Sequence, residues 1–197
     1  ALASRLTSED TDVATASAIA LGRIGGTGAA GALQPLLADD SASLRAAAAQ
    51  GCILCAENFV TDDENTAAIA IYDKVRQADV PKQRKLEATR GAIVARGTEG
   101  VPLLVEQLKS PDKQFLQIGL SVARELPGAE VDEAVAAELA EATPERAALL
   151  MYALADRDLA NMPAGVVAAA SGGDKPVRLA AINLIGRRGS AENLNAL

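Results

Sequence analysis

The chain has 197 residues, of which 49% are hydrophobic and only 2% aromatic, and its formal net charge is −7. This charge argues against binding to nucleic acid or to anionic lipid, both of which attract basic surfaces. Histidine is absent, which removes the commonest general base and metal ligand, and no apolar run approaches the roughly 20 residues that cross a bilayer. We therefore expect no nucleic-acid partner, no membrane insertion, no metal and no cofactor.

Internal repetition organises the sequence. Six stretches can be superimposed, with start-to-start spacings of 31, 41, 30, 31 and 31 residues. Their first residues are Val13, Leu44, Lys85, Phe115, Arg146 and Val177. A fixed period in this range is typical of stacked supersecondary units rather than of a closed globule. We interpret residues 1–197 as a single repeat array, and the helix-like segments 1–6 and 190–197 as the ends of a fragment of a longer chain.

A first helix is predicted at the start of each repeat. Three residues before each start, five of six side chains are hydrogen-bond acceptors suited to a helix N-cap. These residues are Asp10, Ser41, Lys82, Asp112, Thr143 and Asp174. Offsets of three and eight residues are apolar in every repeat, which is the spacing of a buried helical face. A break is expected at offset twelve, at Gly25, Ala56, Gly97, Pro127, Asp158 and Gly189.

A second helix is predicted after most of these breaks, over residues 29–38, 66–78, 101–109, 131–142 and 163–170. Each repeat is then an antiparallel helix pair whose apolar face is covered by its neighbours. The predicted fold class is all-α, with about six helical hairpins. The second repeat is about ten residues longer than the others, and we expect the extra length in a loop over residues 59–65 and in a longer second helix. That loop is interpreted as a solvated connector, with a binding surface as the alternative.

Cys52 and Cys55 form a C-x-x-C pair, a spacing found in redox and metal sites. Both fall within a predicted helix, and Cys52 occupies the apolar position at offset eight. No second pair accompanies them. We interpret both as buried apolar residues, with a disulfide, redox or metal role as the alternatives.

Charged residues gather in two sets. Arginines near the ends of the first helices are interpreted as cations that complement the helix dipole, with an anion-binding ridge as the alternative. They are Arg23, Arg96, Arg157, Arg187 and Arg188. Acidic residues are interpreted as solvated surface rather than as paired catalytic carboxylates. They are Glu130, Asp132, Glu133, Glu138, Glu141, Asp62, Asp63 and Glu64.

Two strings carry a family resemblance. Residues 18–25 read Ala-Ile-Ala-Leu-Gly-Arg-Ile-Gly, and residues 177–189 read Val-Arg-Leu-Ala-Ala-Ile-Asn-Leu-Ile-Gly-Arg-Arg-Gly. They resemble bacterial HEAT repeats, in which an Asp turn precedes Val-Arg and an Ala-rich helix ends in Leu-Gly. This resemblance implies a right-handed alpha-alpha superhelix, a HEAT-like solenoid. The middle repeats depart from the pattern, since Lys85 and Arg146 replace apolar residues and residues 65–90 are similar to a tetratricopeptide repeat.

The overall sequence pattern of the repeats is also similar to that of HEAT segments in large exported multidomain bacterial proteins. This implies an extracytoplasmic accessory module, with a cytoplasmic location as the alternative. The family resemblance implies a non-catalytic scaffold that binds a protein partner or spaces flanking domains of the same chain. Second helices normally line the concave side of such arrays, so the candidate partner-binding residues are Gln34, Asp73, Arg76, Glu106 and Glu138.

The alternative function is a helical-repeat enzyme that resembles a DNA glycosylase or a bilin lyase. A glycosylase needs a cationic groove and aromatic residues against which a base can stack, and neither feature is evident in this sequence. We therefore expect no catalytic residues.

Overall fold

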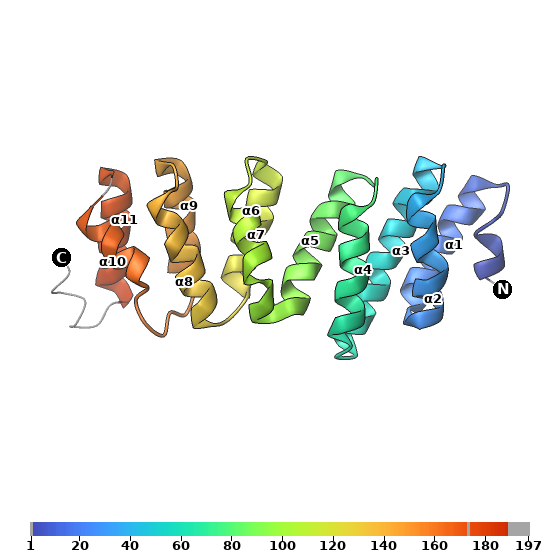
Figure 1. Cartoon of the computed structure of the whole chain (residues 1–197), viewed down its shortest axis with the longest axis horizontal. Coiled ribbons are helices and arrows are strands. Elements are labelled where there is room, and N and C mark those ends of the chain that lie inside the picture. The colour runs from blue at the N-terminus through green and yellow to red at the C-terminus, as the bar shows by residue number, and fades with distance from the viewer. Residues whose placement is uncertain (1, 173, 189–197) are drawn as a thin grey trace. The chain divides into compact units, whose positions relative to one another are not determined.

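A computed structural model describes residues 2–172 and 174–188 (Figure 1). Every regular element in these residues is a helix, and successive helices pack as neighbouring hairpins. The predicted all-α, helical-repeat fold class is therefore confirmed. The chain divides into two compact units, Ala1–Arg96 and Gly97–Leu197. The expected break at Gly189 and the segment 190–197 lie outside the described residues.

The first unit contains two helical hairpins and the first helix of a third. A short 3-10 helix, η1 (Ala3–Arg5), precedes them. The first helices are α1 (Thr11–Ile24), α3 (Ala42–Thr61) and α5 (Lys82–Arg96). The second helices are α2 (Gly26–Leu33), which continues into the 3-10 helix η2 (Gln34–Ala38), and α4 (Asn65–Gln77). Within this unit α1 packs on α3, and α4 packs on both α3 and α5.

The second unit begins with the 3-10 helix η3 (Gly97–Gly100), which leads into α6 (Val101–Lys109). A hairpin of α7 (Lys113–Glu125) and α8 (Ala129–Ala137) follows, and α8 continues into η4 (Glu138–Ala140). The last described helices are α9 (Pro144–Ala155), α10 (Ala164–Ser171) and α11 (Lys175–Arg188). Here α7 packs on α9, and α11 packs on α9 and α10.

Helix starts follow the predicted N-cap positions. Four side chains accept hydrogen bonds from N–H groups two or three residues later, namely those of Asp10, Ser41, Asp112 and Thr143. Lys82 is instead the first residue of α5, and Asp174 directly precedes α11. The predicted second helices agree with α6 at both ends and, when the 3-10 continuations η2 and η4 are included, with the other observed helices to within three residues.

The predicted break at Ala56 is wrong. Helix α3 continues through this residue for 20 residues in total and ends at Thr61. No glycine or proline interrupts residues 56–61, and Phe59, expected in a loop, is 5% exposed in the core. The inserted length therefore extends the first helix, and the connection shrinks to residues 62–64, where Asp63 adopts a φ of 61°. Helix α4, with 13 residues, is a longer α-helix than α2, α6, α8 or α10, but α2 and η2 together also span 13 residues, so the expectation of a longer second helix is met only in part.

Helices α1 and α3 cross in direct backbone contact at two glycines. A Cβ atom added to Gly22 would lie 2.4 Å from Cα of Gly51, and one added to Gly51 would lie 2.6 Å from the carbonyl oxygen of Ala18. Both distances are shorter than any tolerated contact, so only glycine permits this approach. Close helix approach of this kind suits an alanine-rich chain that has few large side chains to fill a wider gap.

Candidate functional site

The candidate residues of the first unit lie on adjacent second helices. Gln34 is the first residue of η2, and its side-chain oxygen accepts a hydrogen bond from Lys74 of α4. Asp73 of α4 forms an ion pair with Arg76 at 3.0 Å and a second one with Arg96 of α5. Gln34 therefore contacts α4 through Lys74, whereas Asp73 and Arg76 bind each other.

Glu106 and Glu138 belong to the second unit. Glu106 is exposed on α6 and has no ion-pair partner among the described residues. Glu138 begins η4, is largely buried, and forms an ion pair with Lys109 at 3.2 Å. Glu106 is thus available to a partner, whereas Glu138 mainly connects η4 to the end of α6.

A shallow depression of about 580 Å³ lies beside Gln34 in the first unit. It has two cationic side chains: Lys74 donates to Gln34, and Arg45 donates hydrogen bonds to the carbonyl oxygens of Asp39 at 2.8 Å and Asp40 at 3.1 Å. Arg45 also contacts the carbonyl oxygen of Asp79 at 2.9 Å and its carboxylate at 3.0 Å. Because these acceptors use its donors, Arg45 ties two inter-helix turns together and does not present a free anion site.

The two cysteines are structural residues. Cys52 and Cys55 are both 0% exposed on α3 and carry free thiols. The Cys55 thiol donates to the carbonyl oxygen of Gly22 at 3.7 Å, and burial raises the pKa of Cys52 to about 12. A thiol held in its neutral form by an apolar environment is a poor nucleophile and a poor metal ligand. These contacts support the interpretation of both side chains as core residues.

The acidic and basic sets need one correction each. Asp132 was expected on a solvated acidic surface, but it is 6% exposed and forms a buried ion pair with Arg157. The Arg157 guanidinium also donates to the carbonyl oxygens of Ala123, of Leu126 at 2.6 Å and of Gly128 at 3.3 Å. Arg157 therefore provides hydrogen-bond donors for the last carbonyl oxygens of α7, one repeat earlier, rather than for those of its own helix.

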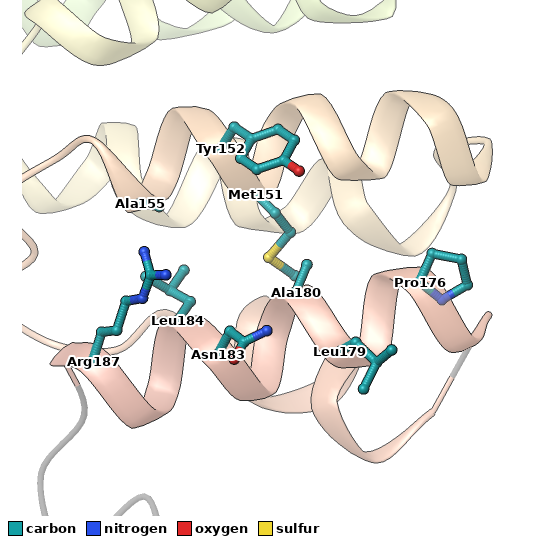
Figure 2. A pocket seen from close by; sticks show the side chains of 9 residues that line it. All are labelled: Met151, Tyr152, Ala155, Pro176, Leu179, Ala180, Asn183, Leu184 and Arg187. Carbon is teal, nitrogen blue, oxygen red and sulfur yellow. The ribbon is translucent and has the colours of Figure 1, made fainter.

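A groove with a volume of about 360 Å³ lies between α9 and α11 in the second unit (Figure 2). Tyr152 of α9 and Leu179 of α11 form its exposed edges, with 64% and 50% of their surface accessible. Met151 extends from α9 toward α11 and is 1% exposed, so it forms part of the floor. Arg187 reaches from the C-terminal part of α11 toward the end of α9.

The charge of α11 is distinctive in this acidic chain. Between Lys175 and Arg188 the helix contains four cationic residues and no acidic one. Arg188 forms an exposed ion pair with Asp158 at 3.5 Å. Arg187 has no ion-pair partner among the described residues. The groove therefore combines apolar edges with an available cation at one end.

This groove is absent from the sites predicted from the sequence, although the repeat alignment contains a signal for it. Tyr152 lies six residues after its repeat start, where four of the other five repeats have glutamine, glycine, serine or asparagine. Leu179 lies at offset two, where the other repeats have only polar residues or alanine. Large apolar residues at positions that are otherwise small or polar mark surface that is exposed for a reason other than packing.

In the part of the chain that the structure describes, no group of three or more cysteine, aspartate, glutamate or histidine side chains is arranged to hold a metal ion. Nor is any helix there both long enough and apolar enough to cross a bilayer. The observed class is an all-α helical-repeat protein with an apolar, partly cationic groove.

No protein-family model matches the chain, and no curated protein matches its sequence. Two crystal structures of engineered proteins resemble it. The first is 16% identical, covers 100% of this chain and 98% of its own, and superimposes with a TM-score of 0.47. The second is 17% identical, covers 98% and 86% respectively, and has a TM-score of 0.41.

Proposed function

We propose that the chain is a non-catalytic helical-repeat scaffold that binds a protein partner, and that the groove between α9 and α11 takes part of that partner. The observation that carries this proposal is the exposed pair of Tyr152 and Leu179 above a buried methionine floor. Exposed apolar residues that converge on one opening are typical of interaction sites rather than of ordinary surface.

The groove favours an apolar segment that also carries acidic residues. Its volume of about 360 Å³ accommodates a few side chains rather than a folded domain. The cations of α11, with Arg187 at the groove itself, complement a carboxylate on the partner. An amphipathic helix with two apolar anchors one turn apart and a nearby acidic residue meets both requirements.

The hydrogen bonds between hairpins support a scaffold that holds this groove rigid. Arg146 at the start of α9 donates to the carbonyl oxygens of Lys109 at 2.9 Å and Ser110 at 3.0 Å. Arg124 of α7 pairs with Asp156 at 2.8 Å. Each contact joins residues more than 30 positions apart, so adjacent repeats are connected by more than apolar packing. A stiff array of this kind also suits the spacing of flanking domains.

A non-catalytic role is supported by the structural use of the side chains that carry chemistry elsewhere. Cys52 and Cys55 are buried as neutral thiols. Asp132, the most buried carboxylate of the acidic set, is neutralised by Arg157. A general acid–base pair needs two groups whose environments separate their pKa values within reach of a substrate. These residues are instead committed to holding helices together.

A peptide-display selection tests this function with a defined readout. Helical peptides would be selected on the wild-type chain and counter-selected on a Leu179→Glu variant. Affinity would then be measured from the fluorescence of Tyr152 in a Tyr72→Phe background, which leaves Tyr152 as the sole tyrosine because the chain has two tyrosines and no tryptophan.

We expect acidic amphipathic peptides whose affinity falls at least about tenfold, or 1.4 kcal/mol, on Leu179→Glu. An Ile24→Glu variant is the matched control, because it places the same charge on an exposed isoleucine of the first unit. Selection of no peptides, or equal affinity for the Leu179→Glu variant, would exclude the groove.

The second-helix residues remain a separate candidate surface, and Glu106→Arg is the clean test of it. Glu106 is exposed and unpaired among the described residues, so its reversal changes charge without removing an intramolecular contact. Glu138→Arg would also break the ion pair with Lys109. If the second helices contribute to binding, those selected peptides that carry a basic residue lose affinity with Glu106→Arg while the melting temperature stays constant; unchanged affinity removes Glu106 from the site.

A further inference from the structure

Tyr72 of α4 extends its side chain to the neighbouring helix α5 within the first unit. The hydroxyl end of its ring lies against Gly91 of α5, because a Cβ atom added to Gly91 would lie 2.4 Å from Cζ of Tyr72 and 2.5 and 2.8 Å from the two Cε atoms. Any larger residue at position 91 would collide with the ring. The absence of a side chain on Gly91 therefore makes room for the tyrosine hydroxyl beside α5.

A groove of about 260 Å³ lies where the ring of Tyr72 ends. It is bordered by α3 and α5, and all of its lining residues belong to the first unit. Val94 is 37% exposed at its edge, and Val60 is half-buried. The lining residues are Glu57, Val60, Tyr72, Glu87, Arg90, Gly91, Val94 and Ala95.

The hydroxyl of Tyr72 opens into this groove without a hydrogen-bond partner among the described residues. The side chain is only 3% exposed. Every fully enclosed side-chain oxygen or nitrogen in the described part of the chain has a partner, so the hydroxyl must belong to the small part of Tyr72 that is accessible. A nearly buried polar group of this kind is stabilised when a ligand supplies the missing hydrogen bond.

The charge around this hydroxyl favours a cation. Glu57 is exposed and has no ion-pair partner among the described residues, whereas Glu87 is bound by Arg84 at 2.7 Å. Burial, reinforced by Glu57 and offset to a smaller extent by Arg90, raises the pKa of Tyr72 to about 12. Glu57 therefore acts on the hydroxyl more strongly than Arg90 does, and the field at this point of the groove is negative.

The inserted length of the second repeat adds to the negative field. Between Arg45 and Lys74 the chain has five acidic residues and no basic one. Three of them form the exposed turn between α3 and α4, shortly after Val60 of the groove, and none of the three has an ion-pair partner among the described residues. They are Asp62, Asp63 and Glu64. This end of the groove therefore attracts a basic partner.

We propose that the groove between α3 and α5 binds a lysine side chain from a basic segment of a protein partner. The ammonium group donates hydrogen bonds to the Glu57 carboxylate and the Tyr72 hydroxyl, and the methylene stem packs on Val60 and Val94. Lysine suits these two acceptors because they lie on different helices, whereas a planar guanidinium matches the two oxygens of one carboxylate. Further lysines of the segment meet the acidic turn. This site goes beyond the proposed function of the groove between α9 and α11, which favours the opposite charge.

Amide NMR spectra of the whole chain test the proposal. The probe is an acetylated and amidated hexapeptide of alanine with lysine at its second and fifth positions. It should shift the amide signals of Gly91 and Val94, and the same peptide with norleucine in place of both lysines should not. The n-butylammonium ion should bind more weakly, because it lacks a second cation for the acidic turn. Equal affinity for n-butylammonium would assign the groove to a free amine and overturn the protein partner.

Three variants complete the design. Glu57→Gln should weaken binding of the lysine peptide about threefold. Glu9→Gln is the matched control, because it removes the same charge from an exposed glutamate before α1 and should leave the affinity unchanged. Tyr72→Phe should weaken binding without lowering the melting temperature, since its hydroxyl has no intramolecular bond to lose. The proposal is overturned if the norleucine peptide shifts the same signals, if Glu57→Gln binds like Glu9→Gln, or if Tyr72→Phe leaves the affinity unchanged.

Discussion

Replacement of Gly22 by alanine tests the packing on which the first unit depends. The new Cβ would lie 2.4 Å from Cα of Gly51 and 2.5 Å from its carbonyl oxygen. Both atoms belong to the backbone of α3, so no side chain can rotate away. An ordinary contact requires α1 and α3 to separate by about 1 Å, which loosens the packing along their whole crossing.

The expected loss of stability follows from two opposing terms. Overpacking of this kind costs about 1–3 kcal/mol, whereas alanine gains about 0.5–1 kcal/mol over glycine within a helix. The net loss is about 1–2 kcal/mol because the collision involves backbone on both sides. In a chain of this size each kcal/mol lowers the melting temperature by about 2–4 °C, so a decrease of about 2–8 °C is expected.

Urea unfolding followed by far-UV circular dichroism measures this loss, with Gly31→Ala as the matched control. Gly31 lies in α2, and a Cβ added there would meet nothing within 4 Å. The Gly31→Ala variant should be about 0.5–1 kcal/mol more stable than the wild type, from helix propensity alone. If Gly22→Ala proves as stable as Gly31→Ala, α1 and α3 do not cross in backbone contact at these two glycines.

Two further predictions concern buried ionisable groups. Arg157→Met should cost about 3–5 kcal/mol because it leaves Asp132 buried without a counter-ion, whereas Arg124→Met, which removes a more exposed pair with Asp156, should cost about 1 kcal/mol or less. Equal shifts of the two urea midpoints would contradict this. Burial raises the pKa of Cys52 from 9.0 to about 12, so as pH rises the thiol ionises in the unfolded chain before it ionises in the folded one. The neutral thiol therefore contributes its full stabilisation below pH 9, and this stabilisation is lost as pH approaches 12. Urea midpoints between pH 8 and pH 11 should therefore fall more steeply for wild type than for Cys52→Ala, and parallel curves would remove Cys52 as a contributor.

The helical hairpins could be predicted because their determinants are local and recur in the sequence. The capping side chains of Asp10, Ser41 and Asp112 act within three residues, and the apolar positions repeat with each hairpin. The end of α3 could not be predicted from the same alignment. Ala56 falls where other repeats have a breaker, but alanine does not stop a helix, and Phe59 gains burial by continuing it.

The candidate sites were harder to predict because they depend on contacts between repeats. Asp132 and Arg157 are 25 residues apart, and nothing local to either residue indicates that they meet in the core. Asp73 of α4 similarly forms its ion pair with Arg96 of a different helix, α5. The groove residue Tyr152 does have a local signal, its departure from the polar residues at the same offset, but that signal indicates exposure and not the chemistry of a partner.

Arg157 gives the second unit a particular mode of unfolding. The residue belongs to the turn after α9, yet its guanidinium donates hydrogen bonds to carbonyl oxygens at the end of α7 and neutralises the carboxylate of Asp132 in α8. Unfolding of the α9 hairpin would therefore leave the carbonyl oxygens at the end of α7 without hydrogen bonds and the carboxylate of Asp132 without a counter-ion. Partial melting is penalised as a result, and these hairpins should unfold cooperatively rather than one at a time from the C-terminal side.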